Sequence, residues 1–161
     1  MWARQSYRWS DLDFGANKRE GIAIDWPIRY RDIAPWYSYV ERFIGVSGDA
    51  QGLPELPDGE FQKPMEMNVV EKHVAKKISD AFPGRKMFIG RVATLTEPLH
   101  GRAPCHYCGP CHRGCSGGSY FSSLSSTLPA AESTGNLSLM ANSLVESLEY
   151  DAVSQLSLIH I

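Results

Sequence analysis

Two stretches of the chain carry apolar residues at helical spacing. In the first, Asp32 is a good N-cap, Pro35 fits the first turn, and the apolar pattern runs to Gly45. In the second, Asn68 and Glu71 occupy the two positions of a capping box, which predicts a helix that begins there. The predicted inner faces consist of Ile33, Trp36, Tyr37, Val40, Phe43 and Ile44 in the first helix, and Val70, Val74, Ile78, Ala81 and Phe82 in the second.

Shorter patterns predict strands and one more helix. Residues 87–95 are rich in β-branched and apolar side chains, which predicts a strand. Residues 137–140 and 144–150 predict two further strands, and residues 119–128 predict a short helix after a glycine turn. The mixture predicts an α/β or α+β domain, and 161 residues suffice for one domain with its own core.

Composition excludes some classes of partner. The net charge is −2 with 21% charged residues, so the chain lacks the basic surface expected of a nucleic-acid or anionic-membrane binder. No apolar run approaches the roughly 20 residues that a membrane-spanning helix needs. The sequence assigns no compartment.

The last six residues read differently from the rest. Residues 156–161, LSLIHI, match the translation of an adaptor used in sequencing libraries. We therefore expect residues 1–155 to be the natural segment and residues 156–161 to be an adaptor-derived tail. The alternative is an ordinary apolar C-terminal strand.

The candidate chemistry is concentrated in one loop. All four cysteines lie there with the spacing C-x2-C-x2-C-x3-C: Cys105, Cys108, Cys111 and Cys115. This spacing is that of a bacterial ferredoxin run and predicts these cysteines as ligands of one iron–sulfur cluster, with all four bound or with three bound and one free. Ser116 stands where a proline normally follows. Zinc, with His106 or His112 as substitute ligands, disulfides and free thiols are the alternatives.

Other motifs are absent or weak. The sequence contains no G-x-G-x-x-G, no G-x-S-x-G, no H-E-x-x-H and no phosphate-binding loop of Walker type. Gly114, Gly117 and Gly118 precede the predicted helix and are able to form an anion-binding nest, with a tight turn as the simpler alternative.

Several separated segments of the chain resemble motifs of one enzyme family. Residues 25–41, DWPIRYRDIAPWYSYVE, resemble the W-P-I-x-Y-x-D-L-A-P-Y-Y-x-x-x-E segment of the GMC (glucose–methanol–choline) flavin oxidoreductases. Residues 111–115, CHRGC, resemble the C-x-x-G-C segment of a bacterial subset, and residues 126–131 resemble the Y-L-P-A-A pattern after it. Residues 136–145 are similar to the N-L-x-V … V strand pair. The resemblance covers nearly all of residues 1–151, in the family's order.

The resemblance implies an internal piece of a longer enzyme, with part of the FAD-binding domain and part of the substrate-domain cap. Such enzymes oxidise a CH–OH group of a sugar or alcohol by passing hydride to flavin N5. The ADP-binding unit and the catalytic histidine of the family lie outside the matched segments, so none of the five histidines is assigned that role.

The resemblance also suggests individual residues. Val145 aligns with the strand residue whose backbone contacts the adenine of FAD, and Trp2 and Ala3 align where the chain passes the flavin edge. In some sugar dehydrogenases of the family, cysteines in this region hold an iron–sulfur cluster that relays electrons to an acceptor protein. The alternative function is a small iron–sulfur electron-transfer module or zinc-binding module.

Overall fold

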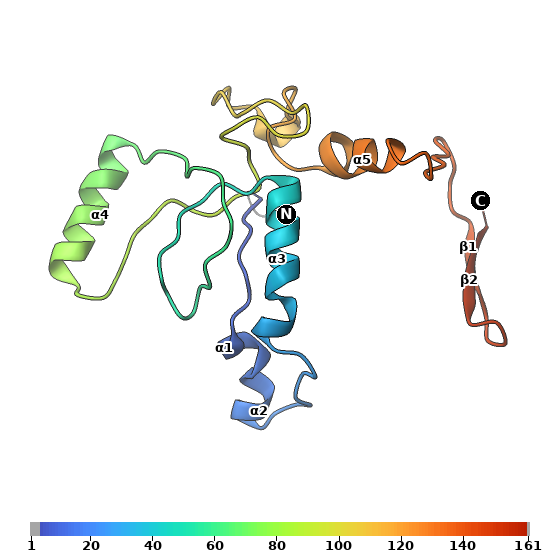
Figure 1. The fold of residues 1–161 in the computed structure, drawn as a ribbon, viewed down its shortest axis with the longest axis horizontal. Helices are drawn as coiled ribbons and strands as arrows, with labels where there is room; N and C mark the ends of the chain where they lie inside the picture. The colour runs from blue at the N-terminus through green and yellow to red at the C-terminus, as the bar shows by residue number, and fades with distance from the viewer. Residues whose placement is uncertain (1–3, 161) are drawn as a thin grey trace. The chain divides into compact units, whose positions relative to one another are not determined.

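The computed structural model describes residues 4–160, with side chains for residues 4–157. It divides into two compact units, Met1–Pro129 and Ala130–Ile161, which we describe separately. The helices and strands in Figure 1 are α1 Asp11–Phe14, α2 Ala16–Glu20, α3 Tyr30–Ile44, α4 Val69–Ala81, the single turns η1 Cys111–Arg113 and η2 Ser123–Thr127, α5 Leu128–Glu132, β1 Ser147–Asp151 and β2 Leu156–His160. The predicted mixture of helix and strand is confirmed. The described residues contain no parallel sheet: their one sheet is the antiparallel pair β1–β2.

The first predicted helix is α3, and its start differs from the prediction. Arg29 is the N-cap, and its backbone N–H donates to the Asp32 carboxylate at 2.8 Å, so Asp32 acts from the third helical position. Pro35 consequently lies inside the helix and not in its first turn. The end at Gly45 is confirmed, with a left-handed φ of 76°. A side chain there would lie 2.1 Å from the Leu95 side chain, so the position requires glycine.

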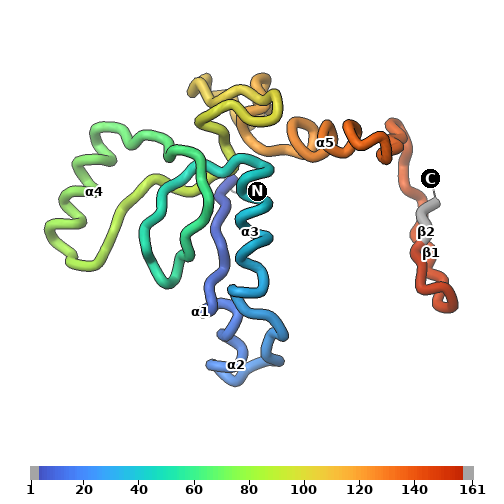
Figure 2. The backbone as a smooth tube through the Cα atoms, in the orientation of Figure 1, coloured from blue at the N-terminus to red at the C-terminus, as the bar shows by residue number. Residues whose placement is uncertain are grey.

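The N-terminal segment is fastened along α3 by a buried ion pair. Figure 2 shows the backbone from residue 4 to α1 running beside that helix. The Arg8 guanidinium donates to both oxygens of Glu41, at 2.8 and 2.6 Å, and also to the Tyr30 hydroxyl and the Ser38 hydroxyl. The Arg8 and Glu41 side chains are 4% and 7% exposed. The hydrogen bonds that Arg8 donates to Glu41 outweigh the effect of burial and raise the pKa of Arg8.

Residues 91–95 form the centre of the first unit, as an extended segment held by single bridges. The segment was predicted as a strand, but it pairs with its neighbours at isolated positions only. Val92 exchanges backbone hydrogen bonds with Ser47, at 2.9 and 3.0 Å, and the Ala93 N–H donates to the Arg4 carbonyl at 2.9 Å. The prediction of an extended segment holds, and that of a regular strand is wrong because no neighbour runs alongside for more than one bridge.

The interior of the first unit is polar. Its buried apolar residues are Phe14, Val46, Ala93 and Leu95, whereas Arg8, Ser10, Glu41, Ser47, Arg91, Arg102, Ser119 and Ser126 are buried polar or charged residues. Hydrogen bonds compensate part of this burial, although nitrogens of Arg91 and Arg102 and the Ser119 hydroxyl have no partner among the described residues. The fully buried Arg91 guanidinium donates to the Pro57 carbonyl at 2.7 Å and to the Asp58 carboxylate at 2.7 Å, which fastens the segment that connects α3 with α4.

The second predicted helix is α4. Its capping box is confirmed, because the Glu71 N–H donates to the Asn68 side chain at 2.9 Å and the Asn68 N–H donates to the Glu71 carboxylate at 2.7 Å. The predicted inner face is wrong for the described chain. Val70 is 70% exposed and Phe82 is 53% exposed, and α4 contains no buried residue.

The C-terminal predictions need three corrections. The helix expected over residues 119–128 begins at Ser123 as η2 and continues through α5, because the Ser122 hydroxyl accepts from the Ser125 N–H and caps it there. Residues 137–140 form no strand, and the strand expected over residues 144–150 begins only at Ser147, in β1.

The second unit ends in a two-stranded hairpin. The predicted adaptor-derived tail forms β2, which pairs antiparallel with β1 from Ser147↔His160 to Asp151↔Leu156. All described side chains of residues 132–136 and 138–157 are exposed, so the hairpin has no covering layer. An isolated two-stranded hairpin is marginally stable in water. The origin of residues 156–161 stays a prediction.

Candidate functional site

The loop that carries the cysteines is fixed at both ends to the central segment 91–95. On the entering side, the Cys105 N–H donates to the Leu95 carbonyl at 2.8 Å. On the leaving side, the Leu95 N–H donates to the Ser119 carbonyl at 2.8 Å, and Thr94 bridges to Tyr120. The loop is therefore closed into a ring by main-chain hydrogen bonds, independently of any bond between its sulfur atoms.

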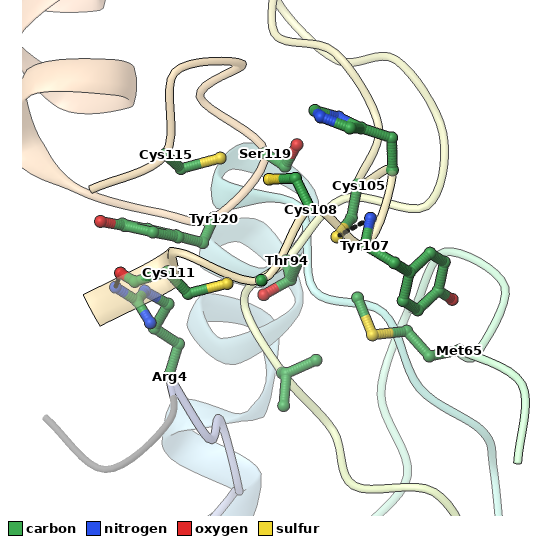
Figure 3. A pocket seen from close by; sticks show the side chains of 13 residues that line it. Arg4, Met65, Thr94, Cys105, Tyr107, Cys108, Cys111, Cys115, Ser119 and Tyr120 are labelled. Atoms are coloured by element: carbon green, nitrogen blue, oxygen red, sulfur yellow. Dashed lines mark hydrogen bonds between the residues drawn. The ribbon is translucent and has the colours of Figure 1, made fainter. Parts of the chain in front are cut away.

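This closure brings all four cysteines to one pocket of about 370 Å³. Cys105 and Cys115 are half-buried, Cys108 and Cys111 are exposed, and all four are free thiols. Figure 3 shows the side chains of Cys108 and Cys115 pointing toward one another across the pocket. His106 also lines the pocket, whereas His112, the other histidine considered as a zinc ligand, is exposed on η1.

Cys115 lies in a turn of backbone N–H groups. Burial raises the pKa of the Cys115 thiol, but the backbone N–H groups of Tyr120, Ser119 and Gly117 and the Ser119 hydroxyl lower it, and they prevail. Of the glycines considered as an anion-binding nest, Gly117 contributes its backbone N–H to this sulfur, and the Gly118 N–H donates to the Cys115 carbonyl at 3.0 Å. Gly118 makes the turn with a φ of 65°.

The Ser119 side chain is the buried polar group of this site. Ser119 is 2% exposed and lines the pocket, yet its hydroxyl oxygen makes no full hydrogen bond among the described residues. Its effect on the pKa of Cys115 means that it lies near that sulfur, in a contact short of hydrogen-bond geometry. A buried hydroxyl without a partner is uncommon and calls for an explanation.

Arg4 forms part of the opposite wall. Its guanidinium carbon lies 3.2 Å from the centre of the Tyr120 ring, and its Nη2 donates to the Cys111 carbonyl at 3.2 Å. Sequence reasoning missed Arg4, Ser119 and Tyr120. No pattern around them signals a site, because Arg4 reaches the pocket through backbone pairing and Ser119 belongs to a serine-rich run.

The thiols do not converge on a single metal ion. A tetrahedral zinc site holds sulfur at about 2.3 Å from the metal, so neighbouring sulfurs stand about 3.8 Å apart. Across residues 4–160, no three cysteine, histidine or carboxylate side chains come together in that way. Four cysteine thiols that line one cavity are the kind of donor set that a thiolate-bound cluster uses.

The residues suggested for flavin contact are Val145, Trp2 and Ala3. Trp2 and Ala3 lie outside the described residues. Val145 was expected in a strand, but it precedes β1 and is 51% exposed. The second unit has no buried residue between positions 130 and 157 that would line an adenine pocket. The assignment of Val145, Trp2 and Ala3 to FAD contact stays a prediction.

Comparison with known proteins gives one partial relationship. No protein-family model matches the chain. Over 100 residues the chain is 29% identical to the 2-methyl-1,2-propanediol dehydrogenase of Mycolicibacterium austroafricanum. The match covers 59% of this chain and 18% of that protein. The chain is thus a distant relative of part of an alcohol-oxidising dehydrogenase, and it spans less than a fifth of that enzyme's length.

No helix in the described part of the chain has both the length and the apolar character needed to cross a bilayer.

Proposed function

We propose that this chain is a segment of an FAD-dependent oxidoreductase of the GMC type, which oxidises a CH–OH group of a sugar or alcohol. The observation that carries the proposal is the partial match to a diol dehydrogenase. The W-P-I-x-Y pattern at residues 26–30 and the glutamate at position 41 support it independently. FAD, when bound in the complete protein, would supply the hydride acceptor.

Two residues of the resembling segment have a structural role in the described chain. Tyr30 and Glu41 are the acceptors that hold the Arg8 guanidinium, at 2.7 Å and at 2.8 and 2.6 Å. This contact fixes the N-terminal segment on α3, so the pattern is explained by packing. In the proposed enzyme, the chain would supply part of the FAD-binding domain and part of the substrate-domain cap, together with the cysteine pocket.

The test of the proposal is the complete reading frame around this sequence. Expressed whole, the protein should purify yellow with a flavin spectrum and reduce a dye acceptor in the presence of a sugar or alcohol. A complete protein without flavin would refute the proposal. The 161-residue chain alone should not bind FAD, which is measured by quenching of flavin fluorescence; binding at micromolar concentration would contradict our account of the exposed second unit.

A second candidate is supported by the pocket itself. The position of four free thiols on one cavity favours an iron–sulfur centre, either as an electron relay within such an oxidoreductase or as a separate electron-transfer module. The chain should be purified without oxygen and analysed for iron, acid-labile sulfide and zinc. Brown protein with sulfide supports the cluster. Colourless protein with stoichiometric zinc supports the zinc module. Protein that contains neither iron nor zinc would have free or disulfide-bonded thiols.

A further inference from the structure

The cysteine pocket has a cationic wall that the sequence pattern did not reveal. Arg4 lines the same cavity as the four thiols, and its guanidinium is held over the Tyr120 ring and against the Cys111 carbonyl. Within the described residues, the ion pairs include none between Arg4 and a carboxylate. Its positive charge is therefore not neutralised by an acidic side chain of this part of the protein.

The backbone of Arg4 is held in an unusual conformation. Arg4 has a φ of 58°, in the left-handed region that costs a residue with a side chain about 1–2 kcal/mol. Its carbonyl accepts from the Ala93 N–H at 2.9 Å and from the Ser6 hydroxyl at 3.1 Å, and these bonds hold the conformation in place. Such local strain is typical of binding sites, where it positions a side chain.

Ser119 supplies a hydrogen-bond donor at the same pocket. Its hydroxyl is buried and without a full partner, as described above. The Arg4 guanidinium, which has no carboxylate partner among the described residues, and the Ser119 hydroxyl, which has no full hydrogen-bond partner there, are both complementary to a negatively charged occupant of the pocket. A metal cluster bound by four thiolates is such an occupant, because the four thiolate charges outweigh the positive charge of its core.

We propose that Arg4 and Ser119 are positioning residues for a thiolate-bound iron–sulfur cluster in this pocket, and that together they raise its reduction potential. The inference rests on the iron–sulfur candidate above and not on the flavin proposal. Reduction adds one electron to an already negative centre. A nearby cation and a hydrogen bond to sulfur stabilise the reduced form more than the oxidised form.

The chain offers matched controls for both residues. Arg113 lies in the same loop and carries the same charge, but it is exposed and does not line the pocket. Ser116 is an exposed serine next to Cys115. Solvent screens the charge at Arg113, so its removal should leave the centre nearly unaffected.

The experiment measures midpoint potentials of the 161-residue chain after anaerobic reconstitution, by titration with dithionite followed by visible absorption. We expect Arg4→Gln to lower the equilibrium constant for reduction about tenfold, which equals 59 mV for a one-electron couple. Ser119→Ala should shift it in the same direction by less. Arg113→Gln, Ser116→Ala and the charge-conserving Arg4→Lys should stay near wild type. Iron and sulfide contents, measured in parallel, verify that each variant holds the cluster.

Several results would overturn the proposal. Arg4→Gln and Arg113→Gln with equal potentials would mean that Arg4 only braces the loop. A shift in Arg4→Lys as large as in Arg4→Gln would point to lost packing and not to charge. Wild-type chain that assembles no cluster would remove this inference and the iron–sulfur candidate, while the flavin assay on the complete protein would still decide the oxidoreductase proposal separately.

Discussion

The buried pair of Arg8 and Glu41 gives the sharpest prediction about stability. Glu41→Gln leaves the Arg8 charge in place, 4% exposed, without a carboxylate opposite it. Removing one partner of a buried ion pair typically costs about 3–5 kcal/mol. We expect a loss of that size in the free energy of unfolding, because the pair is doubly hydrogen-bonded and nearly fully buried.

The double variant Arg8→Met with Glu41→Leu should lose much less than the two single variants together. It removes both charges at once, and the main remaining penalty is the Glu60 backbone N–H, which donates to Glu41 at 3.1 Å and loses its acceptor, at about 1–3 kcal/mol. The losses in unfolding free energy of the single variants Arg8→Met and Glu41→Leu, added together, should therefore exceed the loss in the double variant by at least about 2 kcal/mol.

Urea unfolding followed by tryptophan fluorescence measures these differences. Arg42→Met is the control: Arg42 lies on the same helix as Glu41, but its ion pair with Glu60 of the following loop is exposed, so its loss should leave the midpoint unchanged. The reasoning would be refuted by single variants whose unfolding free energy lies within about 1 kcal/mol of wild type. It would also be refuted by a double variant whose loss equals the sum of the two single losses.

Three further predictions follow from single contacts. Gly45→Ala should cost about 2–5 kcal/mol in urea unfolding, because it adds left-handed strain to a clash with Leu95. Burial raises the pKa of Asp58, but hydrogen bonds from two backbone N–H groups and the Arg91 guanidinium lower it on balance, so Asp58 stabilises the fold above its unfolded pKa and this stabilisation is lost as pH falls through its folded pKa. The stability difference between wild type and Asp58→Asn should accordingly shrink below about pH 4, measured by urea unfolding at several pH values. Asn68→Ala should destabilise α4 by about 1 kcal/mol, seen as faster amide hydrogen exchange in that helix alone.

Local signals in the sequence predicted local structure well. The capping box of α4 and the glycine end of α3 were both predicted, because each depends on residues within four positions of one another. The start of α3 was missed because Asp32 caps from inside the helix, which its residue type alone does not distinguish from an N-cap.

Long-range arrangement was less predictable. The apolar side of α4 was predicted to face inward, and it is exposed in the described chain, because what covers an apolar face depends on parts of the fold that periodicity does not encode. The cysteines were predicted as one cluster of ligands and do share one pocket. Arg4 joins them from about a hundred positions away, through backbone pairing with residues 91–95 that no spacing rule anticipates.

The polar interior of the first unit has a thermal consequence. Unfolding a protein raises its heat capacity mainly through exposed apolar surface, and exposed polar surface lowers it. The interior of the first unit contains the charged residues Arg8, Glu41, Arg91 and Arg102, whereas its buried apolar residues among those described are few. Unfolding this unit therefore exposes little apolar surface and much polar surface. The free energy of unfolding should therefore vary unusually little with temperature. Cooling toward the freezing point should lower it less than in a protein whose core is mainly apolar.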